Sequence, residues 1–155
     1  MTDNGFTFFV RGLPATQGSM KAIMSHSTGR PIVVRDNPKG LTAWRRAIGD
    51  EARSAAGFTA PVEGPVAITA HFFLPRPLGH FGTGRNAGVL KPSAPAFPTT
   101  KPDADKLVRA RFDALKSDAA AYRDDAQVVR MVVSKDYADH DYPPGVEVHF
   151  RRFAA

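Results

Sequence analysis

The stretch Lys101-Pro102-Asp103-Ala104-Asp105-Lys106-Leu107-Val108-Arg109 carries the strongest structural signal in this sequence of 155 residues. Asp103 directly follows a proline and stands where a helix N-cap belongs. Apolar and basic residues then recur at helical spacing, namely Leu107, Val108, Arg111, Phe112 and Leu115. The pattern predicts a helix from about residue 104 to residue 116.

The sequence on both sides of this helix predicts one further helix and five strands. Residues 40–56 place apolar side chains at the helical period, which predicts an amphipathic helix. Residues 65–75 are apolar and partly β-branched between two prolines, which indicates a central strand. The other predicted strands are 6–12, 31–36, 126–135 and 145–151.

Residues 76–100 contain eight prolines and glycines and predict a long flexible loop. Loops of this length in compact domains are usually functional or mobile. The order of the elements predicts an α/β (α+β) fold, with a mixed β-sheet and two main helices packed on it. The length predicts a single domain that spans residues 1–155.

The composition favours a polyanionic partner. Lys and Arg number 21 against 15 Asp and Glu, which gives a net charge of +6 and a pI near 10.0. Such a surface favours DNA or RNA through counterion release at phosphates. The sequence has no cysteine, which excludes disulfides, thiolate zinc sites and cysteine nucleophiles and fits a reducing cytoplasm. We expect a soluble cytoplasmic protein because no segment reads as a leader or a membrane span.

Two carboxylate clusters stand out in this basic chain. Asp103 and Asp105 open the predicted helix, and Asp124-Asp125 follow some twenty residues later, before a predicted strand. Clustered carboxylates repel one another, and a hard divalent cation that prefers oxygen ligands relieves the repulsion. The two clusters therefore predict metal-dependent chemistry on nucleic acid, provided that the helix start and the strand start converge in the fold.

Structural explanations compete with this one. Asp103 could cap the helix, and Asp105 could interact with the helix dipole and pair with Arg109 four residues later. Asp124 and Asp125 could serve only a turn. A calcium-binding loop is excluded because Leu107 and Val108 stand where an oxygen ligand and a glycine are needed. Residues 82–88 lack Gly-Lys-Ser/Thr, so no nucleotide cofactor is expected.

The run 101–115, followed by Tyr122-Arg123-Asp124-Asp125-Ala126-Gln127-Val128-Val129, resembles the signature of RusA-type Holliday-junction resolvases, including phage-encoded members. The resemblance extends upstream through residues 12–21 and 37–46, and so covers most of the chain. It implies a homodimeric, Mg²⁺-dependent endonuclease of the bacterial cytoplasm. Such an enzyme binds four-way DNA junctions and nicks two strands symmetrically, and Mn²⁺ is expected to substitute for Mg²⁺.

Carried onto this sequence, the resemblance places catalytic and metal-binding acids at Asp103, Asp105 and Asp125. The catalytic lysine position of the family falls on Arg109, which keeps the charge but replaces a compact ammonium with a planar fork. Lys106 stands where the family often has asparagine. Neither departure removes an acid.

We expect the DNA contacts to come largely from cations outside the acidic cluster. The candidates are Lys21, Arg45, Arg46, Arg85, Lys101, Lys106 and Lys135. Phe81 and Phe97 in the predicted loop are candidates for stacking on an unpaired base. The alternative function is a non-catalytic, architectural DNA-binding protein that uses the same basic surface while its acids only cap and turn.

Overall fold

The computed structural model describes residues 5–18, 20–35, 37–57 and 60–153, and its centre is a four-stranded sheet. The strand order is β1 (Gly5–Arg11), β6 (Gly145–Arg152), β4 (Val66–Leu74) and β5 (Val128–Tyr137). β4 pairs with β5 in parallel, and the other pairs are antiparallel. The predicted mixed sheet is confirmed, and so is the central position of β4.

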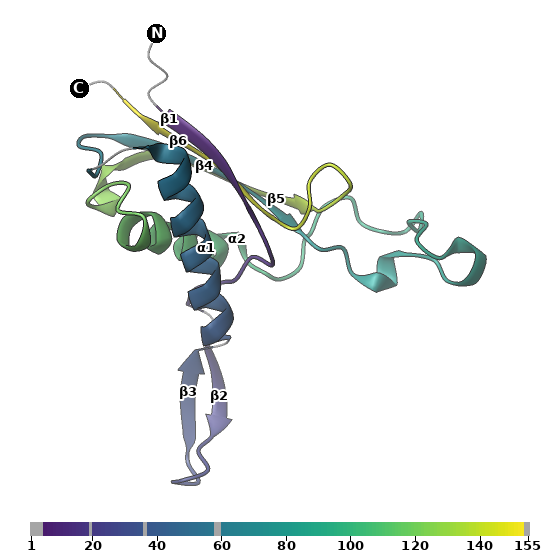
Figure 1. Ribbon diagram of the computed structural model, residues 1–155. Coiled ribbons are helices and arrows are strands. Elements are labelled where there is room, and N and C mark those ends of the chain that lie inside the picture. Colours follow the sequence, from purple (N-terminus) through teal and green to yellow (C-terminus); the bar gives the residue numbers. More distant parts are fainter. Residues whose placement is uncertain (1–4, 19, 36, 58–59, 154–155) are drawn as a thin grey trace.

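Helices α1 (Pro38–Ala56) and α2 (Ala104–Asp113) share one core with this sheet (Figure 1). Alternate residues of β4 are buried, because successive side chains of a strand point to opposite faces. Ile68 and Phe72 from β4 lie in the same cluster as Ile48 from α1 and Leu107 from α2. The predicted α+β fold with two main helices is therefore confirmed, although α2 continues as a π-helical turn, η3 (Ala114–Asp118).

α1 begins two residues before its predicted start because Asn37 caps it. The Asn37 side-chain oxygen accepts a hydrogen bond from the Gly40 amide at 3.1 Å, and Pro38 occupies the first helical turn, where its missing N–H costs nothing. The helix ends at Gly57, whose φ of 61° is the left-handed conformation that favours glycine. α1 thus has defined boundaries at both ends.

A β-hairpin forms a second, separate sheet of β2 (Met20–Met24) and β3 (Pro31–Arg35). The strand predicted at residues 31–36 is confirmed as β3. Met20 and Lys21 had been assigned to a polar stretch, and this assignment is wrong because both lie in β2. Met20-Lys21-Ala22-Ile23-Met24 has one β-branched residue and no alternation of polar and apolar residues. Its conformation comes from pairing with β3, which local propensity does not record.

The prediction that Asp124 and Asp125 lead directly into a strand is wrong. They begin a 3₁₀ turn, η4 (Asp125–Gln127), and β5 starts only at Val128. The Asp124 carboxylate accepts from the Ala126 amide at 2.9 Å, and the Gln127 side chain accepts from the Asp124 amide at 2.9 Å. This reciprocal cap explains Asp124 structurally but leaves Asp125 outside the cap.

The long segment 76–100 is less irregular than predicted. It contains two 3₁₀ turns, η1 (Leu78–His80) and η2 (Gly84–Asn86), and an isolated bridge between Phe81 and Leu90. The Lys91 ammonium also donates to the Gly79 carbonyl at 2.8 Å. These local bonds organise the segment, and its flexibility stays a prediction. Within the described ranges, none of the helices is long and apolar enough to cross a membrane.

The core also contains a charge. Arg111 on α2 is 0% exposed, and its three guanidinium nitrogens have no hydrogen-bond partner among the described residues. The guanidinium lies 4.8 Å from the centre of the Phe112 ring. Burial lowers the pKa of Arg111 to about 10. A base whose pKa is lower in the folded protein opposes folding at every pH below that value.

We therefore expect Arg111→Met to raise the free energy of unfolding by about 2 kcal/mol, because an apolar side chain of similar volume removes a buried, unpaired charge. Urea denaturation at pH 7 measures this change. Arg46→Met is the matched control, because Arg46 is exposed on α1 and its loss should change stability by less than about 0.5 kcal/mol. A less stable Arg111→Met variant would show that the guanidinium has an acceptor.

Candidate active site

Asp103 stands at the N-terminus of α2 with its carboxylate available to a ligand. Its backbone is extended and it occupies the N-cap position, as predicted, yet its side chain makes no capping hydrogen bond within the described part of the chain. The carboxylate instead pairs with the Lys106 ammonium at 3.3 Å and keeps 45% of its side-chain surface exposed. The capping explanation of Asp103 is thus not realised in the side-chain contacts.

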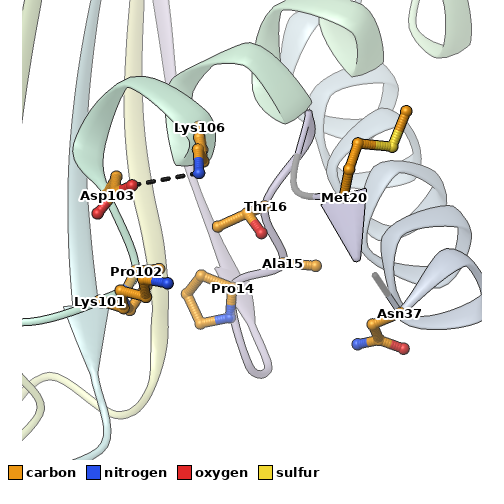
Figure 2. A pocket seen from close by; sticks show the side chains of 9 residues that line it. All are labelled: Pro14, Ala15, Thr16, Met20, Asn37, Lys101, Pro102, Asp103 and Lys106. Atoms are coloured by element: carbon orange, nitrogen blue, oxygen red, sulfur yellow. Dashed lines mark ion pairs between the residues drawn. The ribbon is translucent and has the colours of Figure 1, made fainter. Parts of the chain in front are cut away.

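A pocket of about 420 Å³ opens beside this carboxylate. Figure 2 shows Lys101, Asp103 and Lys106 along one side of it. Thr16 from the loop after β1 and Met20 from the hairpin lie opposite. The pocket therefore joins one carboxylate and two ammonium groups at a helix N-terminus, where backbone N–H groups favour an anion.

The loop after β1 is tied to α2 and forms the wall of this pocket. The Gln17 amide donates to the Lys106 carbonyl at 3.0 Å, and the Gln17 side chain donates to Asp113. The Arg109 guanidinium lies so close to Gly18 that a Cβ atom there would come within 3.0 Å of Nη1. Gly18 also has a φ of 87°, so both its conformation and its neighbour favour glycine.

Asp105 and Arg109 are both exposed on α2. In the described ranges no ion pair joins them, so the predicted pairing of these two residues is not seen. Asp105 lies in the first turn of the helix, close in sequence to Asp103. The start of α2 therefore presents two carboxylates, of which only Asp103 has an ion-pair partner within the described part of the chain.

Lys135 connects the end of β5 to the segment that leads into α2. Its ammonium donates to the Thr100 carbonyl at 2.9 Å and to the Pro102 carbonyl at 3.0 Å. A lysine has three N–H donors, so one is left for another acceptor. Lys135 thus positions the backbone next to Asp103, and a contact with DNA from its third donor stays a prediction.

Asp125 lies at the other end of α2. The Tyr122 hydroxyl donates to its carboxylate at 3.2 Å, and the same hydroxyl lies 3.5 Å from the Phe112 carbonyl in the last turn of the helix. The Lys116 ammonium is 4.0 Å away. Burial raises the pKa of Tyr122, and the negative charge of Asp125 and the hydrogen bond to it raise it further. Tyr122 therefore stays a neutral donor that orients Asp125.

The three predicted metal ligands do not meet within one chain. α2 rises about 1.5 Å per residue, so its two ends are separated by about 15 Å. Among the described residues there is no group of three or more His, Cys, Asp or Glu side chains that could hold a metal ion. The expected convergence of the helix start and the start of β5 therefore does not occur inside a single copy.

The other predicted DNA contacts are spread over the molecule. Arg46 is exposed and Arg45 partly exposed on α1, Lys21 is exposed on the hairpin, and Arg85 is exposed in η2. Only Lys101 and Lys106 of the predicted set line the pocket beside Asp103. Sequence reasoning missed the roles of Gln17 and Tyr122. The partners of Gln17 lie far away in sequence. The contact of Tyr122 with Asp125 depends on the turn before β5.

The comparison with protein families shows which family the chain belongs to. The model of the family "Endodeoxyribonuclease RusA" matches residues 17–151. The chain belongs to the RusA family. The resemblance seen in the acidic motifs is thus confirmed.

One curated relative is similar to this chain over a shorter stretch, and its name states no function. The uncharacterized protein YqaN of Bacillus subtilis (strain 168) is 34% identical over 99 residues. The match covers 61% of this chain and 62% of YqaN, so the chain spans less than two thirds of that protein. The RusA assignment therefore depends on the family match and on the residues described above.

Proposed function

We propose that this RusA chain is a structure-specific endodeoxyribonuclease that resolves four-way DNA junctions by paired, symmetric nicks in the presence of Mg²⁺. The observation that carries the proposal is the Asp103 carboxylate at the start of α2, flanked by Lys101 and Lys106 in an open pocket. The two ammonium groups and the helix N-terminus attract a DNA phosphate. The carboxylates supply the acid–base and metal-binding chemistry that phosphodiester hydrolysis needs.

The fit of a metal ion to a single chain is incomplete. Asp103 and Asp105 offer oxygen ligands of the kind Mg²⁺ prefers, but Asp125 lies at the far end of α2. One chain alone therefore does not provide the predicted set of three carboxylates. Lys106 and Arg109 do not depend on the metal for their role, which is to neutralise negative charge on the phosphate as the bond breaks.

A homodimer that pairs two β5 strands would complete the set. β5 is at the edge of the sheet, and Val129, Met131 and Val132 expose 62%, 49% and 50% of their surface. An edge strand with exposed apolar residues is a template for pairing with another strand. Two copies related by a two-fold axis would pair these strands antiparallel, which extends the sheet across both.

The same pairing brings the separated acids together. Antiparallel strands place the start of β5 in one copy beside the end of β5 in the other. Asp125 stands just before the start of β5, and Lys135 near its end holds the backbone next to Asp103. Asp125 of one copy would then face Asp103 and Asp105 of the second copy. The exposed edge of β5 and the contact of Lys135 beside Asp103 support both the homodimer and the shared metal ligands.

The direct test uses purified protein with a labelled four-way junction and with a linear duplex of the same sequence. We expect Mg²⁺ to support nicks at two symmetry-related positions in the junction, with little cleavage of the duplex. Removal of the metal with EDTA should abolish nicking, and Mn²⁺ should restore it. Denaturing gels of each labelled strand show the cut positions.

Two results would contradict the proposal. Equal cleavage of junction and duplex would show that the chain is a nuclease without junction specificity. Tight, salt-sensitive binding of the junction without nicking in Mg²⁺ or Mn²⁺ would favour the architectural DNA-binding protein instead.

A further inference from the structure

The β2–β3 hairpin projects from the body of the protein beyond the start of α1 (Figure 1). It pairs with no strand of the main sheet, and all five residues of β2 are exposed. A two-stranded hairpin by itself is only marginally stable in water. A hairpin that projects in this way is therefore expected to gain stability from a partner.

The hairpin exposes large apolar side chains on both faces. In its register Ile23 lies opposite Ile32 on one face, and Met24 lies opposite Pro31 on the other. The exposed fractions are 60% for Met20, 41% for Ile23, 60% for Met24, 42% for Ile32 and 67% for Val33. A cluster of exposed apolar residues marks an interaction surface. Because both faces are apolar, the fitting partner surrounds the hairpin or admits it between two surfaces.

The charge of the hairpin selects the kind of partner. Residues 20–35 contain Lys21, Arg30 and Arg35 and no acidic residue. Such a segment repels a second copy of itself and attracts a polyanion. Met20 at the foot of the hairpin lines the same pocket as Asp103, so DNA that reaches the candidate active site also reaches the hairpin. Nucleic acid therefore fits this surface better than protein does.

We propose that the hairpin enters the branch point of a four-way junction. The apolar side chains of Ile23, Ile32, Met24 and Val33 lie against the faces of bases that the branch point leaves accessible, while Lys21 and Arg30 contact the surrounding phosphates. Apolar side chains inserted between base steps separate them, whereas a continuous duplex resists this by stacking. The inference rests on the proposed junction-resolving function and assigns the recognition of the branch point to the hairpin.

The test measures base unstacking with 2-aminopurine placed at the branch point. All proteins carry Asp105→Asn, so that the junction stays uncut in Mg²⁺. We expect the hairpin with its apolar residues to raise the fluorescence, and Ile23→Thr/Ile32→Thr to remove most of this rise. Threonine keeps the β-branched shape and so preserves strand propensity. Junction affinity should fall about tenfold and duplex affinity should change by less than about twofold.

The control is Leu78→Thr, because Leu78 is 89% exposed but lies in η1, outside the hairpin. Ile23→Leu/Ile32→Leu should keep the fluorescence rise, since it retains the apolar surface. An unchanged rise in the threonine variant with normal junction binding overturns the hairpin proposal and leaves the nuclease intact. A shift from dimer to monomer in that variant also overturns it, in favour of a second copy as the occupant. Failure of the Asp105-containing protein to prefer the junction overturns the proposed function itself.

Discussion

Asp105→Asn is expected to lower the rate of junction nicking by about a thousandfold, with junction binding changed by less than about twofold. Asp105 is exposed in the first turn of α2, and in sequence it lies between Asp103 and Lys106, which both line the pocket. The amide keeps the size of the carboxylate but removes its charge, its affinity for a divalent cation and its capacity to act as a base. Nicking in Mg²⁺ and junction affinity by fluorescence anisotropy measure the two quantities separately.

The chain offers a matched acid as the control for this prediction. Asp124 precedes Asp125, but its carboxylate is used in the cap of η4. Asparagine caps a helical turn about as well as aspartate, so Asp124→Asn should nick junctions at close to the wild-type rate. If Asp105→Asn cleaves as fast as the unsubstituted protein, the acid plays no part in catalysis. Equal losses in both variants would point to a general effect of negative charge.

Those parts of the fold that depend on local signals could be predicted from the sequence. The spacing of Leu41, Trp44, Ile48 and Ala52 identified α1, and all four are buried against the sheet. The apolar run of β4 identified a central strand because its side chains are buried, among them Ile68 and Phe72, which lie in one core with α1 and α2. Both features follow from the pattern of apolar residues within one segment, so the segment's own sequence is enough to predict them.

The hairpin and the acidic site depended on information that the sequence does not carry locally. β2 becomes a strand only by pairing with β3, and its exposed Met and Ile side chains gave no alternating pattern to read. The positions of Asp103 and Asp125 depend on the length and direction of α2. The helix separates these two acids, although both belong to the same sequence motif. Sequence order suggested one site in one chain, whereas the geometry places the two halves at opposite ends of a helix.

That separation leads to the prediction of complementation between two inactive proteins. Asp105→Asn and Asp125→Asn should each be inactive alone, but a mixture that exchanges subunits should regain nicking. In a mixed dimer one site combines both substitutions, while the other receives Asp105 from one copy and Asp125 from the second. Random exchange makes about half of the dimers mixed, so about a quarter of all sites should be active.

The number of nicks per junction in the mixture is as informative as the nicking rate. A mixed dimer has one intact site, so it should leave junctions with a single nick and few resolved duplexes, in contrast to the paired nicks expected of the unsubstituted protein. The control is either variant mixed with Asp105→Asn/Asp125→Asn, which contains no combination of copies that restores both acids. Subunit exchange is checked by co-purification of two affinity tags. If exchange occurs and nicking does not return, each site draws its acids from one chain, and the pairing of β5 strands cannot be what completes it.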